Sequence, residues 1–252
     1  MGKERTEGSK LYYLGCSGYF YPGWRGKFYP KDLKPKDWLK YYSKFFNTVE
    51  INSTFYHFPN EKNLRRLYRE TPKDFKFSVK VNRNITHYRK FKDVKELIKN
   101  FYEVCRNGLR EKLGCVLFQL PPSYTYTKEN LERILENLDF GFKNVLEFRH
   151  ISWWNEEVFK ILKERNVTFC SVSAPNLPES LIETSETVYI RFHGKTSWYK
   201  YNYSERELKS WAKKIKKSGA KEIFAYFNND YNAYAPQNCL KLKELLGLLT
   251  VN

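Results

Sequence analysis

The chain has 252 residues, enough for one large domain, with 41% hydrophobic residues and a formal net charge of +17. No uncharged apolar run approaches the roughly 18 residues that cross a bilayer, and the charged first residues lack the apolar core of a signal peptide. The five cysteines are odd in number and form no C-x-x-C pair, which argues against a disulfide framework or a zinc ribbon. We therefore expect a cytoplasmic protein without a membrane segment, whose residues 1–10 form a flexible basic N-terminus.

Apolar runs rich in β-branched and aromatic residues recur along the chain and predict eight strands. In chain order these runs are 11–17, 48–54, 75–81, 114–120, 144–150, 168–173, 187–193 and 223–229. Between them, apolar residues recur at three- and four-residue spacing and predict amphipathic helices. These helical segments are 37–45, 93–106, 128–138, 156–165, 205–217 and 237–248.

Strands that alternate with helices pair in parallel through crossover connections. Eight such units, roughly 250 residues and no dinucleotide-binding glycine fingerprint after the first strand favour a closed (β/α)8 barrel over an open sheet. We predict one barrel domain over residues 11–252. The connection 174–186 has weak helical character, so the sixth unit is expected to be irregular.

All four histidines lie at or just after the ends of predicted strands: His57, His87, His150 and His193. In barrels of this type the active site lies at the carboxyl ends of the strands, an end that we call the mouth. His193 is the strongest candidate, since His57 and His87 fall on loops and His150 starts on the opposite face of its strand.

Successive side chains of a strand point to opposite faces, and here the apolar set must face the helices. The alternating polar set must then point into the barrel near its mouth. Its members are Ser17, Glu50, Asn52, Lys80, Gln119, Glu147, Arg149, Ser173, Arg191, His193, Asn228 and Asp230. Charges inside a barrel are costly unless they are paired, so this set indicates either a functional site or an ion-pair network that only locks the barrel.

Several motifs, spread from the first strand to the last, are specific enough to indicate a family. They are Gly15-Cys16-Ser17-Gly18, Trp24-Arg25-Gly26, Phe28-Tyr29-Pro30, Val49-Glu50-Ile51-Asn52-Ser53-Thr54-Phe55-Tyr56, Phe77-Ser78-Val79-Lys80, Ile85-Thr86-His87, Leu117-Phe118-Gln119-Leu120-Pro121-Pro122, Glu147-Phe148-Arg149-His150, Ser152-Trp153, Arg191-Phe192-His193-Gly194 and Tyr226-Phe227-Asn228-Asn229-Asp230. In these the chain resembles the DUF72 (YecE-like) family over about residues 11–248. The resemblance implies a TIM-type barrel and no established reaction.

Acidic residues and a histidine within a strongly basic protein predict a hydrolase that cleaves phosphodiester bonds in nucleic acid or nucleotides. The predicted catalytic residues are Glu50, Glu147, His193 and Asp230, with the two glutamates as the main acid/base pair. The predicted substrate-binding residues are Asn52, Lys80, Arg149, Arg191, Trp153, Tyr226, Asn228 and Asn229. Cationic side chains would clamp an anion and aromatic ones would stack on bases.

Two other functions remain open at this point. One is a non-catalytic nucleic-acid-binding barrel, and the other is a hydrolase or isomerase of sugars or sugar phosphates. The partner is expected to be nucleic acid or a phosphorylated small molecule, because a basic excess favours polyanions. A divalent metal could be held by Glu50, Glu147, His193 and Asp230, although no recognisable ligand spacing supports one. The scarcity of Met and abundance of Lys and Glu would also suit a thermophile.

Overall fold

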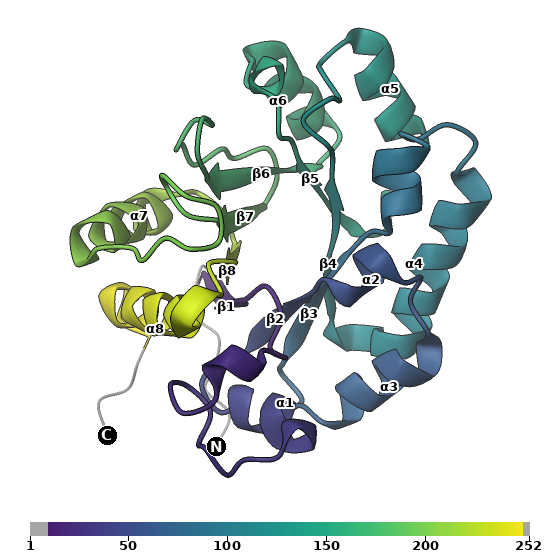
Figure 1. Cartoon of the computed structure of the whole chain (residues 1–252). Coiled ribbons are helices and arrows are strands. Elements are labelled where there is room, and N and C mark those ends of the chain that lie inside the picture. Colours follow the sequence, from purple (N-terminus) through teal and green to yellow (C-terminus); the bar gives the residue numbers. More distant parts are fainter. Residues whose placement is uncertain (1–9, 249–252) are drawn as a thin grey trace.

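The computed structural model describes residues 10–248 and forms one eight-stranded parallel sheet that curls into a barrel (Figure 1). Residues 1–9, which carry most of the predicted N-terminal segment, and residues 249–252 lie outside the described part. The strands are β1 (Leu11–Cys16), β2 (Thr48–Ile51), β3 (Lys76–Lys80), β4 (Leu113–Gln119), β5 (Lys143–Glu147), β6 (Thr168–Ser173), β7 (Thr187–Phe192) and β8 (Glu222–Phe227). The predicted (β/α)8 barrel is confirmed.

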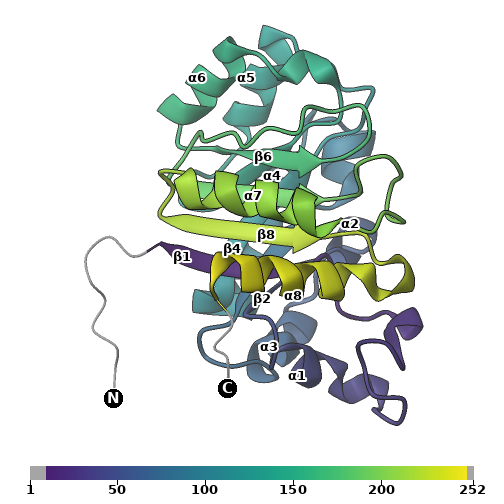
Figure 2. The same cartoon turned by 90° about the vertical axis from the view of Figure 1, so that its left-hand side faces the viewer.

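Helices surround this barrel and run back between successive strands, as Figure 2 shows for α7 and α8 beside β8. They are α1 (Trp38–Tyr42), α2 (Ser53–Tyr56), α3 (Glu61–Arg69), α4 (Lys95–Leu109), α5 (Lys128–Glu136), α6 (Glu156–Glu164), α7 (Glu205–Lys217) and α8 (Tyr234–Leu246). Side chains with short polar groups cap several of them; Ser204, for example, forms a capping box with Glu207. None of the helices in residues 10–248 is long and apolar enough to cross a membrane.

The predicted alternation of side chains produces two apolar layers. Val49, Phe77 and Ile190 belong to the large outer core beneath the helices. A second, smaller cluster fills the barrel interior, and it consists of Cys115, Leu117, Val145, Cys170, Val172, Ala174, Tyr189, Phe224 and Tyr226. We call this cluster the barrel plug. The charged side chains of the candidate site lie between the plug and the mouth, at the carboxyl ends of the strands.

Two details of the strand predictions are wrong. Cys170 and Val172 point inward, so Ser173 points outward, and its Oγ donates to Oε1 of Glu179. The second strand ends at Ile51 rather than at residue 54, because residues 53–56 form the short helix α2. The helix α3 was also not expected, whereas the irregular sixth unit is confirmed by the absence of a helix in residues 174–186.

The barrel closes between β1 and β2, where the two strands share only an isolated bridge between Ser17 and Glu50. Side chains replace the missing backbone ladder. The hydroxyl of Tyr42 accepts from Cys16 N at 2.7 Å and donates to Thr48 O at 2.9 Å. The closure therefore brings the end of β1 against the end of β2, beside Glu50.

Candidate functional site

Glu147, at the end of β5, is the centre of a buried ion-pair network at the mouth. Its Oε2 lies 2.5 Å from Nη1 of Arg191, and its Oε1 lies 2.9 Å from Nε2 of His193. The same Oε1 is 2.6 Å from Nε of Arg149, although that N–H does not point at it. Glu147, Arg191 and His193 are all at most 1% exposed.

Arg191 joins this carboxylate to a second one. Its Nη2 donates to Oε1 of Glu50 at 2.6 Å, and the hydroxyl of Tyr189 donates to the other oxygen of Glu50, also at 2.6 Å. One guanidinium from β7 thus links β5 to β2. Its planar fork suits two carboxylates at once, which an ammonium group could not match.

The network fixes its charges. Burial by itself would raise the pKa of Glu147, but Arg149 and Arg191 outweigh it and hold that pKa well below its ordinary value. Burial, and then the charge of Arg149, lower the pKa of His193 to about 3, so the ring is neutral at pH 7. With Nε2 donating to Glu147, Nδ1 is left to accept from Nδ2 of Asn228, 3.0 Å away.

This geometry favours a positioning role for Glu50 and Glu147 over their predicted acid/base role. Each carboxylate has both oxygens occupied by buried donors, and Glu147 is held ionised. The alternative of a closed ion-pair network therefore describes these two glutamates with Arg149 and Arg191. It does not describe Lys80 or Asp230, which form no ion pair within residues 10–248.

Lys80 ends β3 at the mouth and is half-buried. Its Nζ lies 4.0 Å from the centre of the Phe55 ring. Burial, and then the charge of Arg191, lower the pKa of Lys80 to about 7. The ammonium group therefore titrates near neutral pH.

Asp230 follows β8 and is a carboxylate at the mouth that forms no ion pair with any cation of residues 10–248. Burial raises the pKa of its carboxyl group. Its backbone oxygen accepts from the indole of Trp24 at 3.0 Å, which anchors the loop after β1 to the end of β8.

Three of the predicted substrate-binding residues are fully buried. Trp153 is fully buried on the helix side, stacked on Phe148, and its indole donates to Tyr124 O. Tyr226 lies inside the barrel plug, with its hydroxyl 2.6 Å from Thr48 Oγ1. Asn229 is also fully buried, and its amide donates to neighbouring loop and helix groups.

Other predicted residues do lie at the mouth. Asn228 contacts His193, and Arg149 has its guanidinium 4.5 Å from the centre of the Trp198 ring. Asn52 begins α2, and its Oδ1 is buried without a hydrogen-bond partner. Trp198 and Phe55 were not predicted as site residues, because they lie outside the strand ends that the alternation identified.

Two of the remaining histidines, His87 and His150, have structural contacts. His150 accepts from Ser152 N at 3.2 Å and so caps a short 3-10 turn. His87 lies 2.8 Å from Thr86 Oγ1 through its Nδ1, and its ring packs edge-on against Phe55. Burial, and then Lys80, lower the pKa of His87 to about 4. His57 is exposed at the end of α2.

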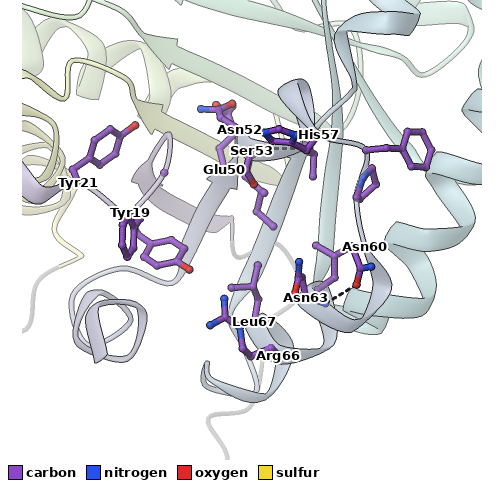
Figure 3. A pocket seen from close by; sticks show the side chains of 17 residues that line it. Tyr19, Tyr21, Glu50, Asn52, Ser53, His57, Asn60, Asn63, Arg66 and Leu67 are labelled. Atoms are coloured by element: carbon purple, nitrogen blue, oxygen red, sulfur yellow. Dashed lines mark hydrogen bonds between the residues drawn. The ribbon is translucent and has the colours of Figure 1, made fainter. Parts of the chain in front are cut away.

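A cavity of about 570 Å³ opens beside the network, between the loop after β1 and the segment from β2 to α3 (Figure 3). The hydroxyl of Tyr19 points into it from one wall, and Arg66 and Asn63 of α3 lie on the opposite wall. Glu50 and Asn52 line its inner end. This cavity therefore lies beside Glu50, and its lining combines polar and aromatic residues with the aliphatic Ile51, Leu64 and Leu67.

The four residues considered as metal ligands do not assemble into a metal site. Glu147 and His193 contact each other, while Glu50 is held by Arg191 and Tyr189, and Asp230 stands apart. No group of three His, Cys, Asp or Glu residues within the described range could hold a metal ion. Guanidinium groups occupy the carboxylate oxygens that a metal would need.

Comparisons with known proteins agree with the fold. The chain is 27% identical to the UPF0759 protein YunF of Bacillus subtilis, over 94% of this chain and 95% of YunF. A match to the UPF0759 protein YecE of Escherichia coli is 28% identical over 44% of this chain and 41% of YecE. A solved DUF72 family protein from Thermotoga maritima is 33% identical, with a TM-score of 0.87 over 94% of this chain and 99% of that one.

The family itself is shown by a match that runs through the barrel. Residues 13–251 match the family described as protein of unknown function DUF72. The motifs that carried the resemblance include Glu50, Glu147, Arg191 and His193, which the structure brings into one network. The chain is a member of the DUF72 family, whose function is not established.

Proposed function

We propose that the mouth of this barrel binds a phosphorylated ligand of the nucleotide or nucleic-acid class and cleaves a phosphodiester bond in it. The observation that carries the proposal is the amine of Lys80, which has no ion-pair partner at the mouth. Glu50 and Glu147 form ion pairs with Arg191 and Arg149. Lys80 has no ion-pair partner among the described residues.

Arg149 and Lys80 supply the phosphate contacts. Arg149 is held on one side by Glu147 and on the other by the face of Trp198, so its orientation is set before a ligand arrives. Guanidinium and ammonium groups are the usual partners of phosphate oxygens. The net charge of +17 adds a long-range attraction for polyanions.

Asp230 supplies the general base. Its side chain lies at the mouth without a cationic partner among the described residues, and its raised pKa makes it a stronger base than an ordinary aspartate. A water molecule attacks phosphorus and its proton passes to Asp230, while the bond from phosphorus to the leaving oxygen breaks. The leaving oxygen takes a proton from solvent, and Asp230 returns its own proton to solvent. Glu147, Glu50, Arg191 and His193 act as positioning residues that hold Arg149 and the strand ends in place.

The second candidate, binding without cleavage, is favoured by the occupancy of both glutamates. Because both oxygens of each glutamate are already hydrogen-bonded, Asp230 is the carboxylate of the mouth left for acid/base chemistry. Replacing Asp230 separates the two functions.

The test measures binding and cleavage of labelled single- and double-stranded DNA and RNA, with a panel of divalent metals. We expect Arg149→Met and Lys80→Met each to weaken binding by about 10- to 100-fold, since each removes a charged contact of ~1.5–3 kcal/mol. Asp230→Asn should retain binding and lose about 10²- to 10⁴-fold in cleavage rate.

Lys221→Gln is the matched control, because it removes a lysine at the opposite end of the barrel, where its Nζ pairs with Glu186. Equal loss of binding in Lys221→Gln and Lys80→Met would contradict a phosphate site at the mouth. Binding without any cleavage by the unchanged protein would leave only the second candidate.

A further inference from the structure

The half-buried Lys80 differs from Lys112, the buried lysine of residues 10–248, in having no oxygen partner. The Nζ of Lys112 donates to Tyr68 O, Thr71 O and Thr71 Oγ1 at 2.6–3.1 Å. The Nζ of Lys80 has no hydrogen bond or ion pair to any described residue, and it lies 4.0 Å from the centre of the Phe55 ring. A lysine needed only for stability would be expected to resemble Lys112.

The surroundings of Lys80 favour its neutral amine. The guanidiniums of Arg191 and Arg149 oppose a positive charge there, whereas Glu147 and Glu50 favour one. Both carboxylates are already bound by arginine, and His87, which faces Lys80 from the segment after β3, is uncharged at pH 7. At pH 7 roughly half of Lys80 is neutral, against about 0.03% of an ordinary lysine.

A neutral lysine at the end of a barrel strand is a nucleophile for carbonyl compounds. Arg149 lies on a neighbouring part of the mouth and can bind an anionic group of the same molecule. We propose that Lys80 forms an imine with the carbonyl group of a phosphorylated aldehyde or ketone held at the mouth. That the carbonyl compound carries a phosphate group rests on the proposed function. The reactivity of the Lys80 amine does not rest on it.

The reaction needs no oxidant or metal. The Nζ lone pair adds to the carbonyl carbon, and the carbonyl oxygen leaves as water together with both amine protons. A carbon–nitrogen double bond replaces the carbon–oxygen one, and hydrolysis reverses the step. The imine then draws electrons from the adjacent carbon, which is how amines activate carbonyl compounds for bond cleavage or isomerisation.

The test uses pyridoxal 5′-phosphate as the aldehyde and borohydride to trap the imine, followed by peptide mapping of the labelled protein. We expect labelling of Lys80 ahead of all other lysines at pH 7, with a rate that rises through a midpoint near pH 7. Lys80→Met should abolish this fast label, while the matched variant Lys221→Gln should keep it. A midpoint near pH 10, or fast labelling that survives Lys80→Met, would overturn the imine proposal.

Pyridoxal, which lacks the phosphate, separates the two parts of the inference. We expect it to label Lys80 at least tenfold more slowly than the phosphate ester, and Arg149→Met to remove that difference. Equal labelling by both reagents would contradict phosphate binding, and with it the proposed function, but would leave the imine intact. Lys80→Arg removes the amine but keeps a positive charge. Its thermal unfolding is measured to check that loss of the label does not reflect loss of the fold.

Discussion

At the scale of single residues, the site depends on which charges have partners. The carboxylate of Glu147 contacts His193 and two arginines, and these arginines keep it ionised although it is buried. Removing one member would leave the others buried and uncompensated, which costs more than the pair contributes. Lys80 and Asp230 lie outside this network and form no ion pair within residues 10–248.

His193 makes the stability of the fold depend on pH. The folded protein binds a proton at His193 only near pH 3, whereas the unfolded chain binds it near pH 6.5. The unfolded state therefore holds more protons between these values, so the stabilisation is complete above pH 6.5 and decreases as the pH falls. We expect His193 to contribute a loss of up to about 1.4 kcal/mol per pH unit in the free energy of unfolding.

Urea unfolding between pH 6.5 and 5 measures this slope before carboxylates titrate. His193→Gln should make the slope shallower, and what remains belongs largely to His87, whose pKa is shifted in the same direction. His57→Gln, which replaces an exposed histidine outside the network, is the matched variant. A slope that His193→Gln does not alter would show that this ring titrates alike in both states.

At the scale of elements, the closure between β1 and β2 decides whether the mouth forms. The two strands approach so closely that a Cβ on Gly15 would lie 2.1 Å from Thr48 O and 2.6 Å from the Tyr42 hydroxyl. Glycine is required here by space rather than by its backbone angles. This contact places Ser17 beside Glu50 and so sets one wall of the network.

Gly15→Ala should destabilise the protein by about 3 kcal/mol or more. The new methyl group would clash with the backbone carbonyl of Thr48 and push β1 away from β2. The matched variant Gly23→Ala adds the same methyl group where nothing lies within 4 Å, and it should stay within about 0.5 kcal/mol. Chemical unfolding of both variants measures the difference. Similar stability of the two would mean that the β1–β2 closure tolerates separation.

At the scale of the whole molecule, the charge of +17 is divided between the mouth and the helical exterior. Lys213 and Lys217 are exposed on α7 and are not paired with any carboxylate in the described residues. An extended polyanion can contact both the mouth and the exposed lysines of α7. A mononucleotide bound at the mouth is too small to contact those lysines. Salt dependence distinguishes the two, since each phosphate contact adds about one unit to the slope of log affinity against log salt.

Lys213→Gln combined with Lys217→Gln should therefore lower the affinity for a long oligonucleotide and reduce its salt slope. The affinity for a mononucleotide should change by less than about threefold, because the mouth keeps Lys80 and Arg149. Titrations at several salt concentrations measure both quantities. A mononucleotide affinity that falls as much as that of the oligonucleotide would place its site on the exterior.

The sequence by itself determined the barrel, because alternating strands and amphipathic helices leave few ways to bury both faces of a sheet. It also indicated the inward face of Glu50, Lys80, Glu147 and Arg191, since side chains of a strand alternate with a period of two. That rule is local, and it assigned Ser173 to the wrong face of β6 and continued the second strand to residue 54, which lies in α2. Trp153, predicted to bind substrate, is buried beneath the helices.

Only the tertiary structure decided which of the inward charges have partners. Arg191 meets Glu50 from a strand on the far side of the barrel, a separation of 141 residues that no spacing in the chain encodes. The distances between side chains across the barrel depend on the packing of all eight strands at once. The same packing sets how deeply the end of each side chain is buried. For that reason Lys80 emerged as the unpartnered amine of the mouth only when its neighbours were in place.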